Sequence, residues 1–60
     1  MEKKFIIKEI YSGNYYCGIQ LGWDSDIRMA DRFDEIEDAE RFIERDTQGV
    51  YQIEIIYVVW

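Results

Sequence analysis

The chain of 60 residues has seven Lys and Arg against thirteen Asp and Glu, a formal net charge of −6, one cysteine and no histidine. This length predicts a single domain, residues 1–60, whose hydrophobic core is only marginal. The acidic balance argues against direct nucleic-acid binding, and the lack of histidine and of a second cysteine removes the usual zinc ligands and any internal disulfide.

The apolar runs near the two ends of the sequence are short. Lys8 and Glu9 interrupt the first run, and the second is far below the roughly 20 residues that a membrane helix needs. The lone thiol of Cys17 suits a reducing compartment. We therefore expect a cytoplasmic protein that does not associate with a membrane.

Residues 4–11 and 15–23 have the pattern of a β-hairpin. The first segment, KFIIKEIY, is rich in β-branched and aromatic residues, and the turn SGN at 12–14 tolerates positive φ. Alternation in the second segment, YYCGIQLGW, places one set of side chains on a face that we expect to be buried: Tyr15, Cys17, Ile19 and Leu21.

The clearest helix signal follows residue 33. Asp34 can cap the helix with Glu37 in an arrangement like a capping box, and apolar residues recur at helical spacing at Ile36, Ala39, Phe42 and Ile43. We expect a turn at 24–26 and a short edge strand at 29–33 before the helix, and a last strand at 50–59 after it. These elements predict an α+β fold in which one helix packs on one face of a small antiparallel sheet, in the order β-β-short β-α-β.

The last strand carries the leading candidate for an association surface. After the helix, this strand can run into the middle of the sheet, and its alternation puts Ile56, Val58 and Trp60 on the face away from the helix. Because one short helix cannot cover both faces, we expect these residues, with Tyr57 and Trp23, to contact another protein. A homodimer is the simplest such arrangement, and the alternative is that Trp60 folds back over its own core.

The outer face of the helix carries a row of acids at Glu37, Glu40 and Glu44. This row has three interpretations: a solvated charged face, a surface that meets a basic groove on a partner protein, or a mimic of DNA phosphates. Arg41 and Arg45 interrupt the row, and Glu37 can pair with Arg41.

No group in the sequence indicates catalysis, a metal or a cofactor. The segment DSD at 24–26 lacks the glycine and the closing glutamate of a calcium loop, so a turn with capping acids is the better interpretation. Cys17 has no histidine to activate it and is expected to be a buried packing thiol. We therefore expect a protein that is not an enzyme and holds no cofactor.

The motifs KKFIIKEI, MADRFDEIEDAERFIE and VYQIEIIYVV, taken in this order, resemble those of very small proteins encoded by bacteriophages, especially phages of Gram-positive bacteria. The resemblance rests on Ala30, Phe33, Ala39, Glu40, Phe42 and Ile43. It implies a non-enzymatic inhibitor that binds a host anti-phage defence protein and blocks it sterically, in the cytoplasm of the host bacterium. A DNA-mimicking inhibitor and a small structural or regulatory module that pairs with a partner subunit remain the alternatives.

Overall fold

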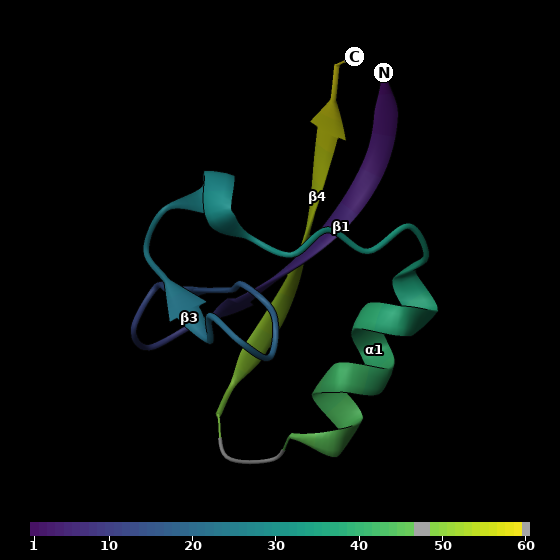
Figure 1. Ribbon diagram of the computed structural model, residues 1–60. Coiled ribbons are helices and arrows are strands. Elements are labelled where there is room, and N and C mark those ends of the chain that lie inside the picture. Colours follow the sequence, from purple (N-terminus) through teal and green to yellow (C-terminus); the bar gives the residue numbers. More distant parts are fainter. Residues whose placement is uncertain (47–48, 60) are drawn as a thin grey trace.

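The predicted α+β class is confirmed in a computed structural model that describes residues 1–46 and 49–59. A four-stranded antiparallel sheet has the strand order β3-β2-β1-β4, and one helix packs against it (Figure 1). The elements are β1 (Glu2–Glu9), β2 (Tyr15–Tyr16), β3 (Trp23–Asp24), the short 3-10 helix η1 (Ile27–Met29), α1 (Ile36–Arg45) and β4 (Tyr51–Val58).

The central strand is β1, and β4 lies at the edge of the sheet. β1 and β4 pair along their full length, from Glu2 opposite Val58 to Glu9 opposite Tyr51. The other edge of β1 is already occupied by β2 and by Phe33, which exchanges backbone hydrogen bonds of 2.9 and 2.8 Å with Phe5. The expectation that the last strand runs in the middle of the sheet is therefore wrong.

The second half of the predicted hairpin is much shorter than residues 15–23. The strand consists of Tyr15, which pairs with Lys8 of β1, and Tyr16, and both residues pair with β3. The chain then forms a turn in which Gly18 and Gly22 have φ of 101° and 76°. These are left-handed conformations that favour glycine, and they end the strand. The prediction that Ile19 and Leu21 share a buried face is wrong, because their exposed fractions are 93% and 67%.

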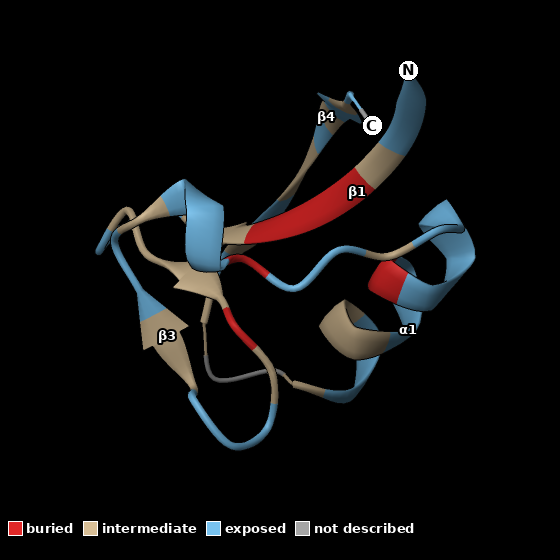
Figure 2. Ribbon diagram, turned by 45° about the horizontal axis from the view of Figure 1, so that its top comes forward, coloured by how far each residue is buried: buried red, intermediate tan, exposed pale blue. Residues whose placement is uncertain are grey.

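The segment between β3 and α1 is not a regular strand. Ile27–Met29 form η1, and only Phe33 at the end of the expected edge strand makes a β-bridge. Asp31 N–H donates to the carbonyl of Tyr16 at 2.8 Å, which ties this segment to the sheet. In Figures 1 and 2, η1 and α1 lie on opposite sides of β1.

The helix begins later than the sequence predicts. Its N-cap is Glu35, whose side chain makes no capping hydrogen bond, whereas the carboxylate of Asp34 accepts a hydrogen bond from the Lys4 ammonium. The predicted capping box of Asp34 and Glu37 is therefore wrong, because β1 places a lysine beside Asp34. This lysine, which also pairs with Glu2 at 3.3 Å, has its pKa raised chiefly by the bond to Asp34.

The core lies between α1 and the sheet. Phe5, Ile7 and Ala39 are buried, and half-buried apolar residues surround them: Tyr16, Trp23, Phe33, Phe42, Tyr51 and Ile53 (Figure 2). Ile6, which points to the other face of β1 by strand alternation, is also fully buried. Both faces of β1 are thus covered at its centre, and the outer strand β4 is left with much more exposure.

Among the described residues, no helix has both the length and the apolar character needed to cross a bilayer.

Candidate functional site

The outer edge of β4 presents unpaired backbone groups. In an antiparallel pair, residues alternate between pointing their N–H and C=O groups at the partner strand and pointing them away. Ile10 N–H donates to the Val50 carbonyl at 2.9 Å, so the even-numbered residues of β4 bond to β1. Phe5 and Glu9 of β1 bond to the opposite side, to Phe33 and Asn14, which agrees with this alternation.

The odd-numbered residues of β4 therefore direct their backbone groups outward. These residues are Tyr51, Ile53, Ile55 and Tyr57, and all have apolar or aromatic side chains. Across residues 1–46 and 49–59, no strand pairs with this edge. The outer edge of β4, from Tyr51 to Val59, is named here the open edge.

The side chains along the open edge change from covered to exposed. Tyr51 and Ile53 pack into the core beneath α1. Beyond them, the exposed fractions are 52% for Ile55, 64% for Tyr57 and 73% for Val59. Figure 1 shows the yellow end of β4 extending past the end of α1, so the helix is too short to cover this part of the strand.

The exposed apolar side chains of Ile55, Tyr57 and Val59 thus lie on the face of the sheet that was expected to be covered by the helix. Ile56 and Val58, which were expected to be the exposed pair, lie on the opposite face and are half-buried. Ile56 stands directly opposite Lys4, whose side chain is only 16% exposed, and Val58 stands opposite Glu2. Long charged side chains cover apolar neighbours with their stems, which explains this partial burial. Trp60 lies outside the described residues.

Trp23 is part of the core. Its ring stacks on that of Tyr51, with centroids 5.4 Å apart and an interplanar angle of 8°, and it meets Tyr16 edge-on at 5.5 Å. Phe42 completes this aromatic cluster from α1. Trp23 therefore stabilises the fold at the place where the sequence analysis expects an interface residue.

A groove lies between α1 and the first half of β4. Its volume is about 330 Å³, and it is lined by Ile43, Tyr51 and Ile53 together with Glu40 and Glu44. The apolar residues form one part of the lining and the two carboxylates the other. Because β4 is the edge strand, this groove adjoins the open edge.

The acidic residues of α1 gather on its outer surface. Glu37, Glu40 and Glu44 are exposed and line a second hollow with Arg41. Arg41 pairs with Asp38 at 3.4 Å, whereas the sequence suggested Glu37 as its partner. Three glutamates of this row therefore have no ion pair among the described residues.

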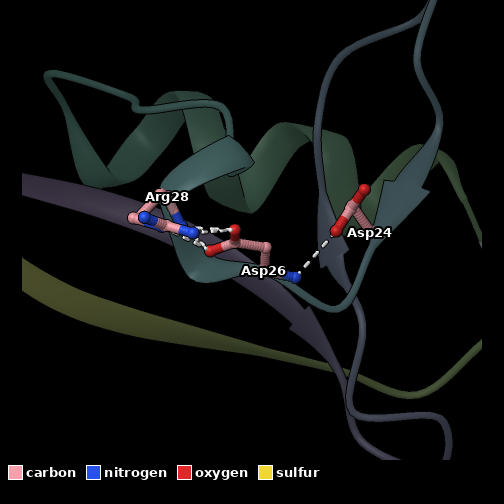
Figure 3. A network of polar contacts seen from close by, with 3 residues as sticks. All are labelled: Asp24, Asp26 and Arg28. Atoms are coloured by element: carbon pink, nitrogen blue, oxygen red, sulfur yellow. Dashed lines mark hydrogen bonds and ion pairs between the residues drawn. The ribbon is translucent and has the colours of Figure 1, made fainter.

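The acids at 24–26 act as caps, as the sequence indicates. Asp24 accepts from the backbone N–H of Asp26 at 2.8 Å, and Asp26 accepts from the N–H of Arg28 at 2.9 Å and pairs with its guanidinium (Figure 3). The hydrogen bonds from Arg28 hold the pKa of Asp26 below its usual value. Within the described residues, no cluster of potential ligands could hold a metal ion.

Sequence reasoning missed the open edge because it placed the last strand between two others. A signal was nevertheless present: residues 50–59 contain no proline and no lysine, and Glu54 is their only charge. Edge strands normally carry such residues as protection against pairing with other chains. No protein-family model, no curated protein and no solved structure matches the chain.

Proposed function

We propose that the protein is a non-enzymatic, protein-binding inhibitor of the phage type that blocks a host anti-phage defence protein by steric occlusion. The observation that carries the binding role is the open edge of β4, where outward backbone groups coincide with the exposed side chains of Ile55 and Tyr57. The resemblance to small phage proteins supports the class of target. Such a protein acts in the bacterial cytoplasm.

An open strand edge binds other chains by adding a strand to its own sheet. Main-chain hydrogen bonds then supply affinity, and the alternate side chains supply specificity. We propose that a second copy of this chain takes this place and forms a homodimer. The acidic row Glu37, Glu40 and Glu44 also lines the second hollow, on the outer side of α1. We propose that this side of the helix faces the target, where complementary charge raises the association rate and fixes the orientation.

A DNA-mimicking inhibitor is the second candidate. It is favoured by the same three glutamates, which have no ion pair within residues 1–46 and 49–59 and outnumber Arg41 in the hollow that they line on α1. A module that pairs with a partner subunit is the third, and the open edge supports it as well. The three candidate functions differ in their effect on the bound target. A defence protein blocked sterically loses its activity, a target of a DNA mimic can no longer bind DNA, and a partner subunit keeps its activity.

The test is capture of the target from a bacterial lysate, followed by an activity assay of the purified target with and without this protein. Inhibition of a defence protein supports the proposal, and a captured target that keeps full activity overturns it. Addition of duplex DNA separates the two inhibitors, because only the mimic is displaced by it.

A matched pair of variants tests the acidic row. Glu37→Lys should weaken target binding about tenfold or more, since rim charges govern association. Asp31→Lys makes the same change in net charge on an exposed residue away from α1 and should leave binding nearly unchanged. Equal loss in both variants would show that only net charge matters.

A further inference from the structure

We infer that two copies of the chain pair antiparallel along their open edges, about a two-fold axis at Ile55, so that Tyr57 and Val59 of each copy fill the α1–β4 groove of the other. This inference deepens the proposed function, since it rests on the homodimer and specifies its register and its reciprocal contacts.

The backbone of β4 is prepared for this pairing. Tyr51, Ile53, Ile55 and Tyr57 direct their N–H and C=O groups outward, and a second antiparallel strand would bond to every one of them. The result is a continuous sheet of both copies. An unpaired row of this length on a strand without proline or lysine is a template for another chain.

Side chains on the open edge are complementary to one another across a two-fold axis. A two-fold interface needs each copy to offer both halves of the contact. The first half of β4 offers a groove with the apolar residues Ile43, Tyr51 and Ile53, and the second half offers exposed Tyr57 and Val59 on the same face of the sheet. Antiparallel pairing places the second half of one strand beside the first half of the other.

The register of the two strands follows from the side-chain alternation of β4 and from the charge of Glu54. An axis at Ile55 puts Ile53 opposite Tyr57 and Tyr51 opposite Val59. It also puts Glu54 opposite Ile56 on the other face. An axis at Glu54 would set two Glu54 carboxylates directly opposite each other, which destabilises a strand pair. An axis at Ile53 or at Ile56 would pair part of the open edge with residues outside it, whereas an axis at Ile55, the centre of the open edge, pairs Tyr51–Val59 with the same residues of the second copy.

The groove explains why the second copy is the occupant. Its apolar residues Ile43, Tyr51 and Ile53 match the exposed apolar end of β4 on the same chain. A monomer has two unfavourable features, the exposed apolar end of β4 and its unpaired edge. The second copy covers both at once.

The experiment is sedimentation equilibrium of the full chain at pH 7 over a concentration series. The wild type should sediment as a dimer, and Tyr57→Glu should raise the dissociation constant at least tenfold because it puts a further carboxylate into a groove already lined by Glu40 and Glu44 of the second copy. Ile19→Glu is the matched control, since Ile19 is even more exposed but lies in the turn between β2 and β3. It should leave the dissociation constant unchanged.

The register is tested by symmetric disulfides in a Cys17→Ala background. Residues directly opposite in a hydrogen-bonded pair have Cα atoms about 5.5 Å apart, which lies within the range that a disulfide spans. Ile55→Cys should therefore form a covalent dimer under mild oxidation, and Ile19→Cys should not. A covalent dimer from Glu54→Cys but not from Ile55→Cys would overturn the register.

A wild type that remains monomeric at the highest concentration, or a dimer that Tyr57→Glu and Ile19→Glu weaken equally, overturns the inference. Neither result affects inhibition of a captured target, which is measured separately. Circular dichroism of both glutamate variants shows whether the fold is retained. If Tyr57→Glu unfolds the chain, the Ile55→Cys cross-link decides the matter alone.

Discussion

Cys17 shows how far a single residue can be interpreted from its neighbours in the sequence. Its apolar surroundings and the absence of histidine predicted a buried packing thiol, and the structure confirms the burial, with Sγ 3.2 Å from the carbonyl oxygen of Tyr15. Burial raises the pKa of this thiol, and the negative charge of Asp24 adds to the effect. The thiolate is therefore disfavoured in the folded protein.

We accordingly predict that Cys17 reacts slowly with a disulfide reagent such as 5,5′-dithiobis(2-nitrobenzoate) at pH 8. Denaturant should raise the rate to that of the unfolded chain, since unfolding removes both the burial and the field of the acids. The release of thionitrobenzoate measures the rate. Fast reaction without denaturant would show that the thiol is accessible and the interpretation wrong.

Glu9, at the end of β1, makes the stability of the following turn depend on pH. Its carboxylate accepts the backbone N–H groups of Tyr11 and Ser12 at 2.7 and 3.0 Å, and the bond from Tyr11 is the main cause that lowers its pKa. A folded-state pKa below the unfolded value contributes stability that is complete above the unfolded pKa and is lost as the pH falls through the folded one. The ordinary value is 4.5, so this loss begins below about that pH.

We predict that the urea midpoint of the wild type falls on acidification below about pH 4.5. Glu9→Gln should show a smaller fall, because it has no carboxylate to protonate at the turn. The control is Glu35→Gln, which removes a carboxylate whose side chain makes no capping bond. Its acid transition should match that of the wild type, and a Glu9→Gln transition that also matches would contradict the assignment.

At the scale of elements, local pattern predicted β1, α1 and β4 but not the middle of the chain. The strands β1 and β4 have strong β-branched content, and Ile36, Ala39 and Phe42 recur at helical spacing. Residues 17–22 alternate just as well, yet the positive φ of Gly18 and Gly22 turns the chain there. Alternation alone could not show that these glycines bend the strand rather than lie within it.

The start of α1 was missed for a different reason. Asp34 is a good capping residue in isolation, but Lys4 of the central strand binds its carboxylate, and the N-cap moves to Glu35. A contact between residues thirty positions apart decides this boundary. Such a contact depends on the sheet order, which short-range patterns do not contain.

The N-cap of α1 makes no side-chain hydrogen bond, so a better capping residue should stabilise the helix. Glu35→Ser should stabilise the protein by about 1 kcal/mol, because serine can accept a hydrogen bond from the first turn of the helix where glutamate accepts none. Glu35→Ala is the control and should change stability much less. Urea unfolding followed by circular dichroism gives both values. Equal stability of the serine and alanine variants would mean that no capping bond forms.

At the scale of the whole molecule, the amount of apolar surface could be predicted and its position could not. A chain of 60 residues with a single ten-residue helix was expected to leave apolar sheet uncovered, and Ile55, Tyr57 and Val59 are uncovered. This surface was expected on the opposite face because the helix was expected to cover the whole face of Tyr51 to Val59, whereas only Tyr51 and Ile53 pack beneath α1. Strand order decides which strand has the open edge: β2 pairs with one side of β1 and β4 with the other, so the far side of β4 is left without a partner strand among the described residues.

The net charge of the chain should affect the homodimer and the complex with the target in opposite ways. Each copy carries −6, so two copies repel at long range, while an acidic row facing a basic target attracts it. Salt screens both effects: the Debye length falls from about 10 Å at 0.1 M to about 3 Å at 1 M. We predict that added NaCl tightens the homodimer several-fold and weakens target binding, as measured by sedimentation and by titration of the target. Should both associations weaken together, charge attraction would also hold the two copies together, and apolar pairing along β4 could not be the main contact between them.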